Sequence, residues 1–173
     1  MKTVWGKPVC ETLPEILDPA GCAVLVIDAQ NDAMLPEGKF ALAGNDITGM
    51  QEILRRCGAF LSACRELAIK IFHIRVITLR NGMSDSPSWI RAKNGISNEV
   101  EFFLEGTWGA DFCEEVAPLP GEPIVTKHRS SAFVGTDLDQ LLRAARVTTV
   151  VVIGEQTREV RNRLSILEGK VGN

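Results

Sequence analysis

The stretch that decides the fold is Pro123 to Val160, which reads PIVTKHRSSAFVGTDLDQLLRAARVTTVVVIGEQTREV. It begins with a short β-strand that ends at Lys127, continues through a polar loop into the amphipathic helix TDLDQLLRAAR, and returns to an apolar strand at 149–153. A crossover from strand through helix to strand places the carboxyl ends of both strands at one edge of an open parallel sheet. Ligand sites of α/β proteins lie at that edge, so Lys127 is a candidate site residue.

A further strand end carries an acid. Residues 23–27 are apolar without interruption, as in a parallel strand buried on both faces, and Asp28 follows them in VLVIDAQND. The same rule brings Asp28 to the edge where Lys127 lies. An acid and a lysine at strand ends, facing the strand-to-helix turn that starts at Glu155, form an arrangement typical of nucleophilic catalysis.

Length and composition predict one domain over residues 1–173, with an extended N-terminal arm at 1–20 that contains three prolines. The 45% hydrophobic and 24% charged content is that of an ordinary globular protein. The net charge is only −3 and no basic stripe is present, which excludes nucleic acid as a partner. The longest apolar runs have strand length, which excludes a membrane-spanning segment.

The five cysteines indicate a reducing compartment. Their count is odd and their spacing shows no close pairs, so a disulfide framework is not expected and we predict a cytoplasmic protein. Cys57 and Cys64 lie seven residues apart in a helical pattern and are read as small core residues. Cys113 follows GTWGADF and has two readings, a buried core thiol or a nucleophile near the site.

The remaining pattern predicts a helix at 48–67, a strand at 70–79 and a helix that begins with Thr136 as its N-cap. Between them lies a long segment, 80–122, with one short helix expected near 98–104. A connection of that length in a compact protein is usually functional, so it is interpreted as a lid or a substrate wall.

These motifs resemble those of the isochorismatase-like superfamily, also called the cysteine hydrolases. VLVIDAQND, IVTKHRSSAFVGTDLDQLLRA and VVVIGEQT occur in the family's order and at its intervals, over residues 21–160. The resemblance implies an α/β fold of three layers with a doubly wound, mostly parallel sheet. It also implies an Asp–Lys–Cys triad that attacks small amides, of which Asp28 and Lys127 match the first two members.

The third motif departs from the family at the nucleophile. Gly154, Gln156 and Thr157 fit the family pattern, but Val160 stands where the cysteine is expected, as in a branch that resembles this chain and also lacks the thiol. The resemblance implies a cis peptide bond between Glu155 and Gln156. It also implies an oxyanion hole formed by the backbone N–H groups of Gln156 and Val160, which a side-chain substitution leaves in place.

Family members usually continue with further helix and strand units after the nucleophile helix, so we expect C-terminal elements to be missing here. The strand at 149–153 then becomes an apolar sheet edge, which favours pairing with another copy. We therefore predict a homo-oligomer. The alternatives are a shortened product of a longer gene, or coverage of the edge by the N-terminal arm or by the 80–122 segment.

Three aromatic residues in predicted loops are candidate walls for a small planar substrate: Phe40, Trp89 and Trp108. Packing of the loops explains them equally well. The two histidines, His73 and His128, are read as a core residue within a strand and a loop residue, so neither a metal nor another cofactor is expected.

Two function classes follow. The first is a hydrolase of a small-molecule amide or related C–N bond, in which Asp28 activates water because Val160 has neither a proton to lose nor a lone pair to attack with. The second is a catalytically inactive family member that binds a small molecule or forms an oligomer. The retained Asp28, Lys127 and Gly154-to-Thr157 turn favour a preserved pocket, whereas Val160 favours loss of catalysis.

Overall fold

The computed structural model describes residues 1–94 and 102–155, with the backbone alone for 92–94. Its elements are, in chain order, β1 (Lys2–Val4), β2 (Lys7–Val9), α1 (Leu13–Ile16), β3 (Cys22–Ile27), α2 (Asn31–Met34), α3 (Lys39–Leu42), α4 (Met50–Glu66), β4 (Lys70–Val76), η1 (Arg80–Gly82), α5 (Pro87–Asn94), η2 (Trp108–Ala110), η3 (Glu114–Val116), β5 (Ile124–Lys127), α6 (Leu138–Ala144) and β6 (Thr149–Gly154).

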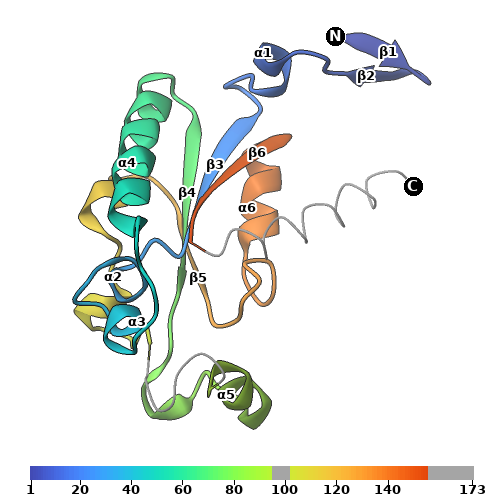
Figure 1. The fold of residues 1–173 in the computed structure, drawn as a ribbon. Coiled ribbons are helices and arrows are strands. Elements are labelled where there is room, and N and C mark those ends of the chain that lie inside the picture. The colour runs from blue at the N-terminus through green and yellow to red at the C-terminus, as the bar shows by residue number, and fades with distance from the viewer. Residues whose placement is uncertain (95–101, 156–173) are drawn as a thin grey trace.

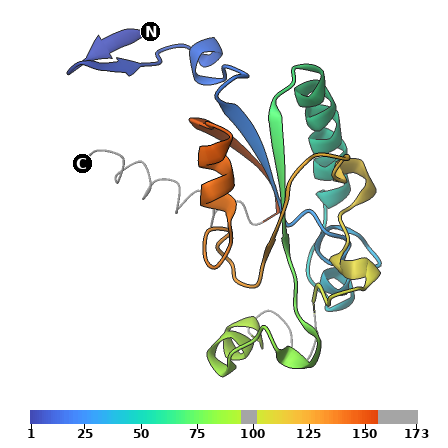
Figure 2. The ribbon, with the colours of Figure 1, turned by 180° about the vertical axis from the view of Figure 1, so that it is seen from behind.

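Four of these strands form a parallel sheet in the order β5-β4-β3-β6. Strand β3 lies inside the sheet and is buried at all six positions, which agrees with its uninterrupted apolar sequence. Helix α4 covers one face of the sheet and α6 covers the opposite face (Figures 1 and 2). The expected α/β fold with a parallel sheet between helical layers is therefore confirmed.

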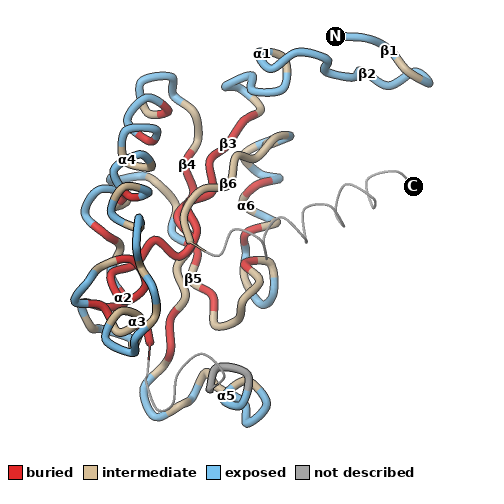
Figure 3. The backbone as a smooth tube through the Cα atoms, in the orientation of Figure 1, coloured by how far each residue is buried: buried red, intermediate tan, exposed pale blue. Residues whose placement is uncertain are grey.

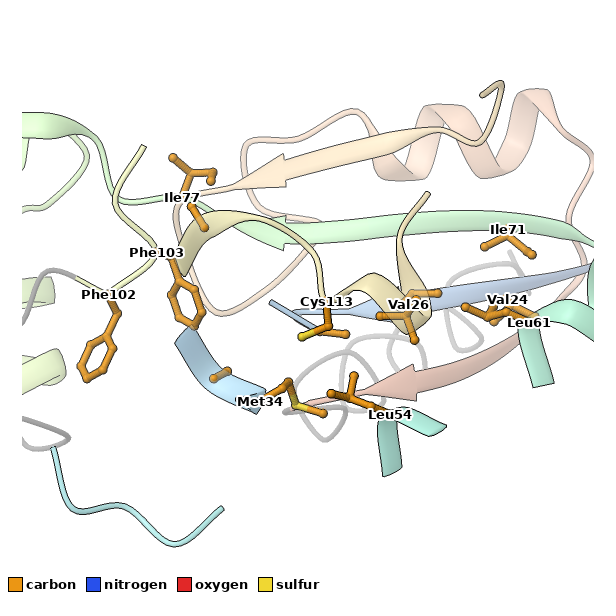
Figure 4. Close-up of a cluster of buried hydrophobic side chains, with 14 of the residues drawn as sticks. Val24, Val26, Met34, Leu54, Leu61, Ile71, Ile77, Phe102, Phe103 and Cys113 are labelled. Carbon is orange, nitrogen blue, oxygen red and sulfur yellow. The ribbon is translucent and has the colours of Figure 1, made fainter. Parts of the chain in front are cut away.

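Alternation along β3 divides the core into two clusters, because successive side chains of a strand point to opposite faces. Val24 and Val26 face α4 and pack with Leu54 and Leu61, as Figure 4 shows. The residues between them on β3 belong to the second cluster, which includes Leu138 of α6. Each such side chain contributes about 1.5–3 kcal/mol when fully buried, so the two faces together hold the sheet. The buried residues are concentrated in and around the sheet, between α4 and α6 (Figure 3).

Several element boundaries differ from those predicted. Helix α4 begins at Met50, not at 48, because Gly49 adopts a left-handed φ of 84°. Strand β4 ends at Val76, whose backbone N–H donates to the Gln30 side-chain oxygen and not to a neighbouring strand. Helix α6 begins after Asp137, not at Thr136; the Thr136 hydroxyl donates to the Ala132 carbonyl in the preceding turn and accepts from the Leu138 N–H at 3.4 Å.

The long 80–122 segment also differs from its prediction. Its helix is α5, Pro87–Asn94, and the described part of the expected 98–104 helix is a turn in which Leu104 pairs with Thr78. A partly buried charge cluster links the end of the segment to α4 and β4: Arg65 donates two hydrogen bonds to Glu122, whose Oε2 lies 2.8 Å from Nε2 of the buried His73.

The N-terminal arm contains a hairpin that the sequence pattern did not indicate. Strands β1 and β2 pair antiparallel around the two-residue turn Trp5-Gly6, whose φ values of 50° and 75° are both positive. Positive φ at both positions matches the twist of a tight hairpin. The hairpin projects from the amino end of β3, with Trp5 96% exposed (Figures 1 and 3).

Strand β6 is at an edge of the described sheet and is half-buried along its whole length. Its outer edge pairs with no strand among residues 1–94 and 102–155. The final helix expected from Thr157 lies outside the described residues. No helix in the described part of the chain is long and apolar enough to cross a membrane.

Candidate functional site

Asp28 occupies the turn where the chain leaves β3. Its φ of 49° lies in the left-handed region, which aspartate tolerates better than most residues, and its backbone N–H donates to the Ile74 carbonyl at 2.9 Å. The residue is only 3% exposed. The turn therefore directs the Asp28 carboxylate into the protein at the carboxyl end of the sheet. Water cannot stabilise its charge there, so the charge depends on protein groups.

Lys127 ends β5 and reaches Asp28 across the intervening strand β4. Its Nζ donates to Asp28 Oδ2 at 2.6 Å and to the Ser130 carbonyl at 2.8 Å, and Lys127 is 3% exposed. The structure thus brings the two sequence-predicted residues into a direct, buried ion pair. A buried pair of this kind is weak evidence for stability, and its position at the carboxyl end of the sheet makes Asp28 and Lys127 candidate functional residues.

Burial dominates the electrostatics of the Asp28 carboxyl. It raises the pKa of Asp28 from 3.8 to about 6, although the charge and hydrogen bond of Lys127 act in the opposite direction. Asp28 Oδ1 is inaccessible and accepts no hydrogen bond from the described residues. A carboxylate with a pKa near 6 and one unused oxygen is suited to take a proton from water or from a substrate at neutral pH.

The carboxyl end of β6 lies against the end of β3. Gly154 has a φ of 106°, and a Cβ at this position would lie 2.2 Å from the Ile27 carbonyl oxygen, so only glycine fits. The next residue, Glu155, donates its N–H to the same carbonyl at 2.9 Å. Because Ile27 directly precedes Asp28, this contact places Gly154 and Glu155 of the third motif beside Asp28 in space.

The remaining parts of the predicted catalytic arrangement lie outside the described residues. These are the nucleophile position Val160, the oxyanion-hole backbone of Gln156 and Val160, the cap Thr157, and the Glu155–Gln156 peptide bond. They stay predictions.

The polar run after Asp28 builds the framework of the site, a role that sequence reasoning missed. Gln30 is fully buried; its Nε2 donates to the carbonyls of Val76 and Ala110 at 3.0 and 2.8 Å, and its Oε1 accepts from the Val76 N–H at 2.9 Å. One side chain thus fastens the turn after β3 to the end of β4 and to η2. The available signal was a run of polar residues directly after a buried strand.

Asn31 and Asp32 extend this framework. Asn31 Nδ2 donates to the Trp108 carbonyl at 2.8 Å, and Asp32 Oδ2 accepts from the Phe103 N–H at 2.7 Å. A Cβ on Gly109 would lie 2.2 Å from Asp32 Oδ1, so the η2 turn packs directly on this carboxylate. Both residues organise neighbouring loops.

The three wall candidates are placed differently. Phe40 is half-buried, with its ring centroid 4.6 Å from that of Phe102, and its contacts are those of a core residue. Trp108 is 50% exposed on η2. Trp89 on α5 packs against Arg129, whose guanidinium carbon lies 5.7 Å from the ring centroid. A substrate contact for these aromatic residues stays a prediction.

The cysteines show no displaced nucleophile among the described residues. Burial raises the pKa of the Cys113 thiol to about 12, and the residue is fully buried, which favours its reading as a core thiol. Cys64 is buried on α4 and Cys57 is half-buried there, in agreement with their reading as core residues. Burial also raises the pKa of both thiols.

The core histidine, His73, is fully buried, and burial lowers its pKa despite its contact with Glu122. His128 begins the loop after β5, and its Nδ1 lies 2.7 Å from the Ile77 carbonyl oxygen. Within residues 1–94 and 102–155, no three His, Cys, Asp or Glu side chains are grouped in a way that could hold a metal ion.

Comparison with known proteins gives a consistent picture. A family model described as the isochorismatase domain matches residues 22–158. The chain is 30% identical to the ureidoacrylate amidohydrolase RutB of Caulobacter segnis, an alignment that covers 87% of this chain and 70% of that protein. It is also 30% identical to RutB of Methylobacterium radiotolerans, covering 83% of this chain and only 60% of that protein.

Two solved structures share the fold. The cysteine hydrolase from Pseudomonas syringae matches with a TM-score of 0.73 at 23% identity, covering 93% of this chain and 72% of that one. An isochorismatase family protein from Desulfovibrio vulgaris matches with a TM-score of 0.71 at 26% identity, covering 85% and 75%. The parallel sheet, the motif order and the family match agree, and the chain belongs to the isochorismatase family.

Proposed function

We propose that this protein hydrolyses a C–N bond of a small ureido or amide compound at the Asp28–Lys127 pair. The observation that carries the proposal is the buried carboxylate itself, which is paired to a lysine on one oxygen and without a described partner on the other. Its relatives named ureidoacrylate amidohydrolases support this substrate class. A carboxylate in this state has a strong preference for a polar ligand.

In the proposed mechanism, Asp28 Oδ1 accepts a proton from a water molecule while the water oxygen attacks the substrate carbonyl carbon. The carbonyl π electrons move to oxygen and form a tetrahedral oxyanion. When the C–N bond breaks, Asp28 returns the proton to the departing nitrogen, so the carboxylate is regenerated. Water takes the part of the cysteine because Val160 has no nucleophilic atom.

Lys127 has two effects in this scheme. Its charge, 2.6 Å from Asp28, holds the carboxyl ionised at neutral pH against the effect of burial. The same positive charge favours the oxyanion that develops on the substrate. The backbone N–H groups of Gln156 and Val160 complete the proposed oxyanion hole.

A second candidate function is small-molecule binding without turnover. It is favoured by Val160, since the thiol that would form an acyl intermediate is absent from the motif. In that case the Asp28–Lys127 pair recognises the N–H groups of a ureido or amide ligand and does not activate water. The two functions share a ligand class and differ in turnover.

An assay of ammonia release from ureidoacrylate and from simple aliphatic amides tests the hydrolase directly. We expect kcat/KM to rise as the pH increases through about 6 and then level off, because Asp28 must lose its proton before it can accept one from water. A rate that is flat between pH 5 and 8 would contradict the role of Asp28 as base. Saturable binding without ammonia release would favour the binding function.

Val160→Cys restores the family pattern and gives a constructive test. We expect the variant to form a covalent adduct with an electrophilic amide, detected by mass spectrometry of the intact protein, whereas the parent chain forms none at residue 160. Peptide mapping separates this adduct from labelling of the exposed Cys10. Absence of an adduct in a folded variant would show that position 160 does not face the Asp28–Lys127 pair.

The expected homo-oligomer stays a proposal. It is supported by the half-buried apolar edge of β6 and by the exposed hairpin tip at Trp5, since exposed apolar groups of this kind are typical of interaction surfaces.

A further inference from the structure

A cavity of about 340 Å³ lies beside the candidate site, on the other face of the sheet. Its lining contains neither Asp28 nor Lys127 and consists of Arg75, Ile77, Leu79, Glu105, Gly106, Ala110, Asp111, Thr126 and His128. Ile77 belongs to the core cluster on the α4 face, whereas Val125, two residues before Lys127, belongs to the α6 face. Because side chains alternate along β5, Thr126 and His128 face away from Lys127.

Arg75 provides the cation of this cavity. It lies opposite Thr126 in the β4–β5 register, and its Nε donates to Thr126 Oγ1 at 3.1 Å, which orients the guanidinium. Within the described part of the chain Arg75 forms no ion pair, so its two terminal NH₂ groups remain available. A half-buried guanidinium with both terminal nitrogens available is suited to bind a carboxylate through two parallel hydrogen bonds.

His128 contributes an acceptor. Its Nδ1 lies 2.7 Å from the Ile77 carbonyl oxygen, and a carbonyl oxygen can only accept, so Nδ1 carries the hydrogen. In the neutral ring this leaves the lone pair on Nε2. The imidazole is therefore held in one tautomer at the cavity wall.

Two carboxylates complete the lining, at its exposed rim. Neither Glu105 nor Asp111 pairs with a described Lys or Arg side chain, although Arg80 donates to the Glu105 backbone carbonyl at 3.2 Å. The cavity thus presents one guanidinium at its sheet side and two carboxylates at its rim. Opposite charges on separate walls match a ligand that itself carries both charges.

We propose that this cavity binds a small zwitterion of the amino-acid type, with its carboxylate on Arg75 and its ammonium group near Glu105 and Asp111. The volume is at the lower end of the range for small-molecule sites, which suits a ligand of this size. The cavity contains neither residue of the proposed hydrolytic pair, although Thr126 and His128 flank Lys127 in the sequence and Ile77 donates its backbone N–H to the Lys127 carbonyl at 2.9 Å.

NMR titration of the ¹⁵N-labelled protein tests the proposal with three matched probes: 5-aminopentanoate, pentanoate and pentylamine. We expect the zwitterion to bind at least tenfold more tightly than either singly charged probe, because only it satisfies both walls. The backbone amide signals of Gly106, Ala110 and Thr126 should shift in a saturable manner.

Variants separate the two walls. Arg75→Gln is expected to weaken the binding of 5-aminopentanoate and of pentanoate tenfold or more and to leave the affinity for pentylamine unchanged. The double variant Asp111→Asn/Glu105→Gln should weaken the binding of 5-aminopentanoate and of pentylamine and leave the affinity for pentanoate unchanged. Arg143→Gln, which removes a cation on the exposed face of α6, serves as the matched control and should change none of the three.

Thr126→Val is a second test in case Arg75→Gln fails to fold. It keeps the Arg75 guanidinium and removes only the hydroxyl that orients it, so we expect it to weaken the binding of both probes that carry a carboxylate. All titrations are repeated in Asp28→Asn, where binding should be unchanged, so the result is independent of hydrolysis. Equal affinities for the three probes, shifts confined to residues outside the cavity, or no saturable shift at all would overturn the proposal.

Discussion

Asp28→Asn is expected to lower kcat/KM for a ureido or amide substrate by about 100- to 10,000-fold, the usual contribution of a positioned general base. The amide of asparagine keeps the size of the side chain and can still contact Lys127, but it cannot accept a proton from water at neutral pH. Initial rates of ammonia release by the purified variant give the value.

The matched control is Asp139→Asn, which makes the same chemical change in an exposed ion pair with Arg143 and should leave kcat/KM within twofold of the parent. Alkylation of the thiols with iodoacetamide should likewise leave the rate unchanged, since no cysteine in the described part of the chain hydrogen-bonds to Asp28 or Lys127 and Cys113 is buried. Undiminished turnover in Asp28→Asn, or inactivation that follows modification of Cys113, would overturn the proposed mechanism.

Lys127→Met is expected to lower the free energy of unfolding by about 3–5 kcal/mol at pH 7, because it leaves the Asp28 carboxylate buried without its partner. Methionine has a similar length and fills the same space, so the change reports mainly the lost charge. Urea denaturation monitored by circular dichroism measures the effect.

The pH dependence of this deficit follows from the direction of the Asp28 pKa shift. Because the folded-state pKa is above the ordinary value of 3.8, protonation of Asp28 stabilises the folded protein, and this contribution is lost as the pH rises through about 6. Removal of Lys127 raises the pKa further, since Lys127 lowers it. The deficit of Lys127→Met should therefore shrink as the pH falls toward 4.

Two comparisons make this test specific. Lys7→Met removes an exposed lysine from the N-terminal hairpin and should change the free energy of unfolding by less than about 0.5 kcal/mol. The double variant Asp28→Asn/Lys127→Met should be more stable than Lys127→Met alone, because no buried charge remains. A Lys127→Met deficit equal to that of Lys7→Met would show that the ion pair is solvated in solution.

The local pattern of the sequence was sufficient for the sheet and for the two charged residues at its carboxyl edge. Residues 23–27 are apolar at every position, and a strand of that kind is stable only when both faces are covered. Asp28 follows that strand and Lys127 ends β5, so the geometry of parallel sheets was enough to bring them to one edge. The family motifs pointed to the same pair.

Details that depend on distant partners were not predictable in this way. α6 starts at Leu138 with Asp137 as its N-cap, and the Thr136 hydroxyl donates to the Ala132 carbonyl while it accepts only a long, 3.4 Å hydrogen bond from the Leu138 N–H. The role of Gln30 depends on carbonyls 46 and 80 residues away, which no local pattern reveals. The cavity beside Arg75 depends on the β4–β5 register, which places Arg75 opposite Thr126.

The sequence by itself therefore determined the α/β class, the parallel strands and the identity of the acid and the lysine, because hydrophobic periodicity and strand-end position are local properties. The tertiary structure alone decided the strand order that lets Lys127 reach Asp28 across β4, and the burial that raises the pKa of Asp28 to about 6. Strand order and burial arise from contacts between segments far apart in the sequence, such as Asp28 and Lys127, and such contacts form only when the chain is packed.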